Sequence, residues 1–67
     1  MKSVQYMGQT FDVPDEAKFV AADGDGEVVW YSQAPTLNKD SLDYEPEHRD
    51  YGFVGFLSRY AFPCEAI

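Results

Sequence analysis

Apolar and polar side chains alternate along the first thirteen residues, as they do in strands that bury one face. The alternation runs over 3–7 and again over 10–13, and Gly8-Gln9 between the two segments favours a turn. We therefore expect a short hairpin over 4–13. Pro14 ends this pattern, because proline lacks an N–H and favours a β-turn or the first turn of a helix.

The strongest strand signals lie at 18–22 and 27–32, where β-branched and aromatic residues predominate. Between them, Asp23-Gly24-Asp25-Gly26 offers two Asp-Gly pairs, which are the strongest short-range signal for a hairpin. Glycine supplies the positive φ that such turns require. We expect an antiparallel hairpin over 18–32.

The second strand of this hairpin is apolar on both faces. Val28 and Trp30 point to one side of the strand, and Val29 and Tyr31 point to the other. Such a strand is usually central in its sheet or covered on both sides. In a protein this small, a partner chain could supply the second cover.

The stretch 33–50 is polar and interrupted by two prolines. We expect a loop with one short helical segment near 38–50, capped by Asn38 or Asp40, with Leu42 as its buried residue. Pro46 would end or restart that segment.

The last apolar run, 51–58, fits either a strand or one face of a helix. Gly52 and Gly55 favour a strand, because each costs a helix about 1 kcal/mol relative to alanine. A strand accommodates glycine where a backbone or a ring approaches closely. The tail over 61–67 is expected to be extended.

These patterns predict a mainly β protein, with a small α+β fold as the alternative. We expect a single domain over 1–67, built as a three- to four-stranded antiparallel sheet around the 18–32 hairpin. A chain of this length buries only about 60% of its unfolded surface, so its stability is marginal. Self-association or a partner is one way to gain stability, because a single cysteine excludes an internal disulfide.

Charge narrows the choice of partner. Twelve acidic residues against five basic ones give a net charge of −7, which repels nucleic acid and anionic membranes and attracts basic surfaces. The alternative is that the charge only keeps the protein in solution. No stretch approaches about 18 apolar residues, so we expect a cytoplasmic protein without a membrane partner.

The candidate sites for metal or catalytic chemistry are incomplete. As a calcium loop, the Asp-Gly turn would place Ala21 and Ser32 where an EF-hand needs carboxylates. As a phosphate loop it lacks the Gly-Lys-Ser/Thr ending. His48 and Cys64 are too few for a zinc site and have no orienting third group for catalysis. We expect no catalytic residue, no cofactor and no metal.

One acidic run stands out as a possible interaction surface. Five carboxylates lie within eleven residues, and two tyrosines lie among or beside them. On a rigid surface such acids could face a basic partner or imitate nucleic-acid phosphates, whereas in a solvated loop they would only resist aggregation. The predicted partner-binding residues are Asp40, Asp43, Tyr44, Glu45, Glu47, Asp50, Tyr51 and, as an aromatic anchor, Trp30.

The segment 11–31, followed by Gln33-Ala34-Pro35, resembles a pattern in small, mostly uncharacterised acidic proteins of tailed bacteriophages. The shared features are the Val13-Pro14 turn, a strand, the Asp-Gly turn and a second strand, and the chain departs from the pattern at 29–31. The resemblance covers about a third of the chain and implies an origin. It transfers no catalytic residue. Small phage accessory proteins often act by binding a host enzyme or defence protein.

We therefore predict a non-enzymatic, phage-type accessory protein that binds and inhibits or modulates a host protein. Its acidic surface would meet a basic or nucleic-acid-binding site of that protein, and it would not contact nucleic acid directly. The alternative is a small self-associating structural protein, such as a homodimer, whose acids serve only solubility.

Overall fold

The computed structural model describes residues 1–41, 43–47, 49–57 and 62–67, and every regular element in these ranges is a β-strand. The strands are β1 (Lys2–Tyr6), β2 (Gln9–Val13), β3 (Phe19–Ala22), β4 (Glu27–Tyr31), β5 (Thr36–Asn38), β6 (Asp43–Glu45), β7 (Tyr51–Phe56) and β8 (Phe62–Ala66). They form an antiparallel sheet in the order β7-β4-β3-β8 and two separate hairpins, β1–β2 and β5–β6. The prediction of a mainly β fold is confirmed.

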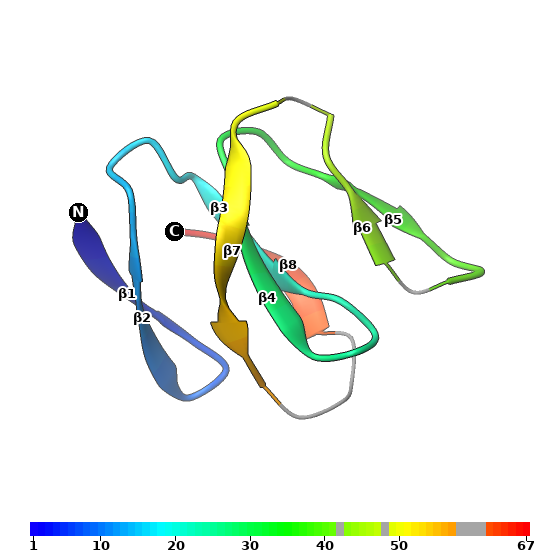
Figure 1. The fold of residues 1–67 in the computed structure, drawn as a ribbon, viewed down its shortest axis with the longest axis horizontal. Coiled ribbons are helices and arrows are strands. Elements are labelled where there is room, and N and C mark those ends of the chain that lie inside the picture. The colour runs from blue at the N-terminus through cyan, green and yellow to red at the C-terminus, as the bar shows by residue number, and fades with distance from the viewer. Residues whose placement is uncertain (42, 48, 58–61) are drawn as a thin grey trace.

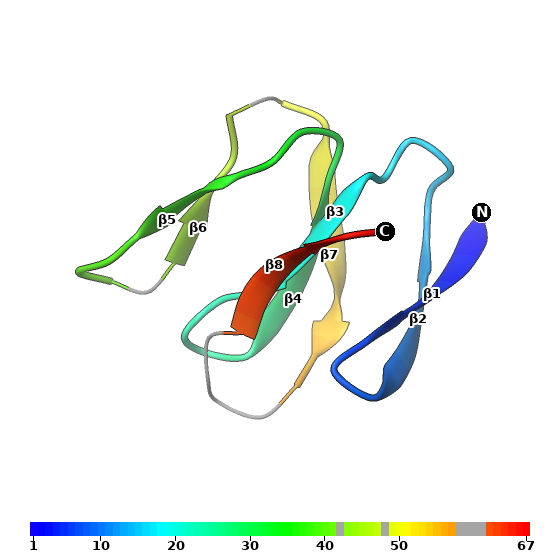
Figure 2. The ribbon, with the colours of Figure 1, turned by 180° about the vertical axis from the view of Figure 1, so that it is seen from behind.

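The two hairpins lie on opposite sides of the four-stranded sheet. Figure 1 looks along the sheet with β7 nearest the viewer, β1–β2 on the left and β5–β6 on the right. Figure 2 shows the reverse view, with the other edge strand, β8, in front. The 18–32 hairpin supplies the two central strands, as predicted.

Each face of the central hairpin has its own apolar cluster, as the two-sided pattern of the 27–32 segment indicates. On the β1–β2 side the buried residues are Tyr6, Phe11, Val20, Ala22 and Val28. On the β5–β6 side they are Ala21, Val29 and Tyr31, with Phe19, Tyr44 and Cys64 packed against them. The second apolar face of the 27–32 segment is therefore covered in part by the β5–β6 hairpin of the same chain.

The turn of the first hairpin lies one residue earlier than predicted. Tyr6 pairs with Gln9, so the turn residues are Met7 and Gly8 rather than Gly8-Gln9. Both have positive φ, 51° and 80°, which is the signature of the type I′ turn that matches strand twist. Met7 breaks the alternation of Val4 and Tyr6, but a methionine is not a usual turn residue and the neighbouring Gly8 is the stronger local signal.

The Asp-Gly segment is a turn, as predicted. The N–H of Gly26 donates to the carbonyl of Asp23 at 2.8 Å, and the N–H of Asp23 donates to the carbonyl of Glu27 at 2.9 Å. Gly26 has a φ of 87°, so the last glycine takes the left-handed position that closes this three-residue turn.

The predicted helical segment near 38–50 is wrong, because the described residues there form the β5–β6 hairpin and irregular turns. Asn38 does cap a turn: its Oδ1 accepts the N–H groups of Asp40 at 3.0 Å and Ser41 at 3.3 Å. The chain then turns back into β6 instead of continuing as a helix. Leu42, which was predicted to be its buried residue, lies outside the described residues.

The run 51–58 forms a strand over 51–56, as the glycines favoured. Gly52 pairs with Trp30, and a side chain at Gly52 would meet the indole ring at 2.7 Å. Gly55 in turn has the ring of Phe11 above it, 3.2 Å from where a Cβ would lie. Ser58 lies outside the described residues.

The extended tail joins the sheet as β8, and Tyr6 ties it to the core. The pairing of β3 with β8 is irregular between Val20 and Ala22. The Tyr6 hydroxyl accepts the N–H of Ala22 at 3.1 Å and donates to the carbonyl of Pro63 at 2.7 Å. One side chain thereby connects β1, β3 and β8.

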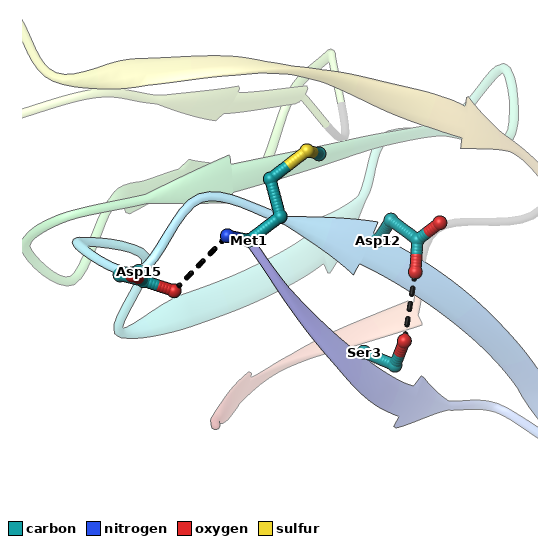
Figure 3. A network of polar contacts seen from close by, with 4 residues as sticks. All are labelled: Met1, Ser3, Asp12 and Asp15. Carbon is teal, nitrogen blue, oxygen red and sulfur yellow. Dashed lines mark hydrogen bonds and ion pairs between the residues drawn. The ribbon is translucent and has the colours of Figure 1, made fainter.

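Polar contacts also fix the start of the chain. The amino group of Met1 lies 3.4 Å from an Asp15 carboxylate oxygen, and the Ser3 hydroxyl donates to Asp12 at 2.8 Å across the β1–β2 pair. Figure 3 shows both contacts. These groups are exposed, and such pairs contribute up to about 1 kcal/mol each. They align the first hairpin without defining a site.

Candidate functional site

Three of the predicted acids are displayed on the β5–β6 hairpin. Asp43 and Glu45 lie on β6 and Asp40 lies in the turn before it, and all three are exposed. The hairpin projects from one side of the sheet in Figure 1. The Asn38 side chain and the register of β5 with β6 hold its backbone, so the carboxylates stand on an ordered element.

Tyr44 fastens this hairpin to the rest of the protein. Its N–H donates to Asp23 Oδ1 at 2.9 Å, and its half-buried side chain packs against the cluster that contains Val29 and Tyr31. Its hydroxyl is hydrogen-bonded to the backbone of Cys64. The structure thus places this predicted anchor residue largely inside its own protein.

Asp23 lies close to two other carboxylates, those of Asp25 and Asp43. Partial burial raises the pKa of its carboxyl, and the nearby carboxylates of Asp43 and Asp25 raise it further. The hydrogen bond from Tyr44 acts in the opposite direction. The end of the β3–β4 turn and the start of β6 therefore share one acidic region.

The two remaining acids lie between β6 and β7. The Thr36 hydroxyl donates to Glu47 Oε1, which connects the start of β5 with the chain beyond β6. Asp50 is exposed, and its carbonyl accepts the N–H of Ser32 at 2.9 Å. Asp50 therefore stands immediately before β7.

The predicted aromatic anchors separate onto the two faces of the sheet. Tyr51 is half-exposed and stacks on Tyr31 with the ring centroids 6.2 Å apart, on the same face as the β5–β6 hairpin. Trp30 lies on the opposite face, where its ring covers Gly52. The structure brings Tyr51, but not Trp30, to the side of the acids.

Two aromatic residues on this face were not among the predicted site residues. Phe53 and Phe56 are 57% and 63% exposed, and their rings meet edge to face with centroids 5.2 Å apart. The sequence assigned the aromatic excess to core packing. A spacing of three would put them on opposite faces of a regular strand, and only the bulge at Val54 and the edge position of β7 bring both rings to this exposed face.

The structure offers little support for chemistry at the lone cysteine. Burial, and secondarily Glu65, raise the pKa of the Cys64 thiol, which is the opposite of what activates a nucleophile. His48, its suggested partner, lies outside the described residues. No group of three or more potential metal ligands, no pocket and no helix able to cross a membrane occurs in residues 1–41, 43–47, 49–57 and 62–67.

Comparisons of the chain with protein families, curated proteins and solved structures find no match.

Proposed function

We propose that this protein is a non-enzymatic binding protein whose acidic hairpin occupies a basic surface of a partner protein. The observation that carries the proposal is the display of Asp40, Asp43 and Glu45 on β5–β6. These carboxylates are exposed, and none has an ion-pair partner among the described residues. They are therefore available to cations of another molecule.

The order of the hairpin supports an interaction role over a role in solubility alone. Carboxylates on a mobile loop lose conformational freedom on binding, whereas a hairpin already fixed at Tyr44 has less to lose. Acids grouped on one element also focus the field of a chain with net charge −7, and such a field speeds encounter with a basic partner. Ordered acids are likewise the requirement for imitating phosphates.

The resemblance to small proteins of tailed phages supports a host protein as the class of partner. In this proposal the partner is a protein of the bacterial cytoplasm whose basic or nucleic-acid-binding site is blocked or modulated. The acidic hairpin and the half-exposed Tyr51 on the same face are the contact residues in this proposal.

A charge-neutral variant tests the proposal. The triple change Asp40→Asn, Asp43→Asn and Glu45→Gln keeps side-chain size, and Asp15→Asn, Glu16→Gln and Glu65→Gln remove the same charge from exposed positions elsewhere. Tagged proteins are used to capture partners from bacterial lysate, with elution by rising salt, and affinity for the captured protein is then measured. Three exposed charge contacts at about 0.2–1 kcal/mol each predict an affinity loss of about 3- to 150-fold.

The expected result is a basic protein that wild type and the control variant retain and release at moderate salt. The hairpin variant should bind it more weakly and with a smaller dependence on salt. Equal affinity and equal salt dependence of the hairpin variant would show that the acids serve solubility only.

A further inference from the structure

The two edges of the four-stranded sheet differ in how they are protected against pairing. On β8, Glu65 carries a charge, which is a feature that discourages strand addition. The Tyr44 side chain also covers β8, since its hydroxyl is hydrogen-bonded to the backbone of Cys64. β7, Tyr-Gly-Phe-Val-Gly-Phe, contains no charge and no proline.

Backbone groups of β7 face outward at this edge. The N–H of Ser32 donates to the Asp50 carbonyl, and the N–H of Leu57 donates to the Gly26 carbonyl. These two bonds determine which residues of β7 are hydrogen-bonded to β4, because such residues alternate along an antiparallel pair. The backbone groups of Gly52 point toward β4, whereas Phe53 and Phe56 direct their N–H and C=O groups away from it. No hydrogen bond among the described residues uses these outward groups.

Exposed rings line the same strand. Tyr51, Phe53 and Phe56 pair in register with Tyr31, Val29 and Glu27, so their side chains share the face that carries the β5–β6 hairpin. An aromatic side chain carries about 150–250 Å², so exposures of 50%, 57% and 63% leave about 250–430 Å² in one strip. That is comparable with the largest apolar patch of a typical monomer, which is often functional.

The strip alone is too small to hold a second copy of the chain. A twofold contact through it would bury about 500–860 Å² in total, below the roughly 1,000 Å² that a specific interface needs. A second copy would also bring together two chains of net charge −7. The bulge at Val54, between the pairs Val28–Gly55 and Val29–Phe53, further limits a long ladder between two copies of β7.

Charge points to a cationic occupant. Glu27 pairs with Phe56 on this face, and Asp43 and Glu45 stand on the hairpin over the same face. Arginine combines a planar group that stacks on aromatic rings with donors that pair with carboxylates. Lysine has the charge but stacks less well, because its ammonium is compact and strongly hydrated.

We propose that the edge and ring face of β7 bind an extended, arginine-bearing segment of the partner protein. This inference rests on the proposed function and adds the chemistry of the contact. A short stretch of the segment pairs with the outward backbone of Phe53, while its arginine side chains lie over Phe53 and Phe56 near Glu27. The aromatic rings supply most of the affinity, and the acids of the hairpin attract the basic segment electrostatically.

The test uses nine-residue peptides of alternating arginine and valine, with lysine–valine and glutamate–valine peptides of the same length. They are titrated into the isotope-labelled full chain, and backbone amide signals are followed by NMR. The arginine peptide should shift the amides of Phe53 and Phe56 most and bind about tenfold more tightly than the lysine peptide, while the glutamate peptide should not bind. Equal binding of the lysine and arginine peptides would overturn the assignment to arginine.

Variants separate this inference from the proposed function. Phe53→Ser with Phe56→Ser should weaken the arginine peptide about thirtyfold or more while its salt dependence stays unchanged. Met7→Asn, which removes an exposed apolar side chain from the β1–β2 turn and suits its positive φ, should bind like wild type. The variant with neutralised Asp40, Asp43 and Glu45 should lose salt dependence instead.

Three outcomes would overturn the inference or the proposed function on which it rests. If the Phe53/Phe56 variant binds as tightly as wild type while the hairpin variant is weakened, the acids act without β7 and only the proposed function stands. If the hairpin variant binds like wild type at every salt concentration, the proposed function fails instead. If sedimentation shows a dimer that Phe56→Ser dissociates, and no peptide shifts the β7 amides, the occupant is a second copy.

Discussion

Gly52 is the position where the packing argument makes its sharpest prediction. A Cβ there would lie 2.7 Å from Trp30 Nε1 and 3.2 Å from Cε2, both inside normal contact distance. Gly52 and Trp30 are paired across β7 and β4, so the backbone cannot retreat without disturbing that ladder. We expect Gly52→Ala to force the indole ring out of its place.

The magnitude follows from two opposing effects. Overpacking at a well-packed position costs about 1–3 kcal/mol. Replacing glycine with alanine stabilises the folded state by about 0.4–1 kcal/mol, because it restricts the unfolded chain. The net loss is then roughly 0–2.6 kcal/mol, out of a total stability of about 3–10 kcal/mol for a chain of this length. The melting temperature should fall by about 4–8 °C for each kcal/mol lost.

Urea unfolding followed by tryptophan fluorescence measures both parts of this effect, because Trp30 is the only tryptophan. The midpoint should fall, and the native emission should move to longer wavelength as the ring becomes more hydrated. Gly55→Ala is the matched control on the same strand, where the nearest atom is Phe11 Cε1 at 3.2 Å. It should cost less and leave the emission unchanged. An unaltered midpoint and emission spectrum for Gly52→Ala would refute the reasoning.

Two further predictions concern polar groups that hold the fold together. Tyr6→Phe removes the acceptor of the buried Ala22 N–H and the donor to the Pro63 carbonyl, so we expect a loss of about 1–3 kcal/mol in urea unfolding. A loss below about 0.5 kcal/mol would mean that the hydroxyl does not bridge the irregular β3–β8 pairing. At Asp23 the folded state raises the pKa above 3.8, so the folded protein binds this proton more tightly than the unfolded chain does. This contribution to stability is present below pH 3.8 and is lost as pH rises through the folded pKa. Asp23→Asn keeps the acceptor for Tyr44, so thermal unfolding from pH 3 to 7 should show it becoming more stable relative to wild type as pH rises. Asp23→Ala should be less stable than Asp23→Asn throughout this range. A constant difference between Asp23→Asn and wild type would contradict the assigned pKa direction.

The parts of the fold that could be predicted from the sequence are those determined by residues close together in the chain. The turn over 23–26 depends on residues within it, chiefly Gly26 with its φ of 87°. The central place of β4 follows from its two apolar faces, which need cover wherever the strand lies. The glycines of β7 were also informative, because both lie under aromatic rings.

The segment near 38–50 was mispredicted because its local signal is ambiguous. Asn38 accepts N–H groups two and three residues ahead, which serves the start of a helix and the turn of a hairpin equally well. The strand pairing is reinforced by the bond from Tyr44 to Asp23, which lies 21 residues earlier in the chain. No local pattern contains that contact.

Edge position is the other property that the sequence does not encode locally. The apolar residues at 51, 53 and 56 are compatible with burial, and the edge position of β7 in the order β7-β4-β3-β8 leaves their side chains exposed. Trp30 and Tyr51 lie on opposite faces of the sheet because Trp30 pairs with Gly52, the residue after Tyr51, and successive residues of a strand point to opposite faces. The acids were predicted from charge alone, whereas the rings beside them required the topology.

The acidic turn at 23–26 connects the fold with the proposed function. Its geometry is that of a hairpin turn, in which Gly26 adopts the positive φ that the turn requires. Yet Asp23 Oδ1 also accepts the Tyr44 N–H, and thereby positions the strand that carries Asp43 and Glu45. Burial in this arrangement raises the pKa of the Asp23 carboxyl, and the nearby carboxylates raise it further, which is an electrostatic cost to the isolated protein. A basic partner would relieve that cost, so the same charges that oppose one another in the free protein favour a cationic surface.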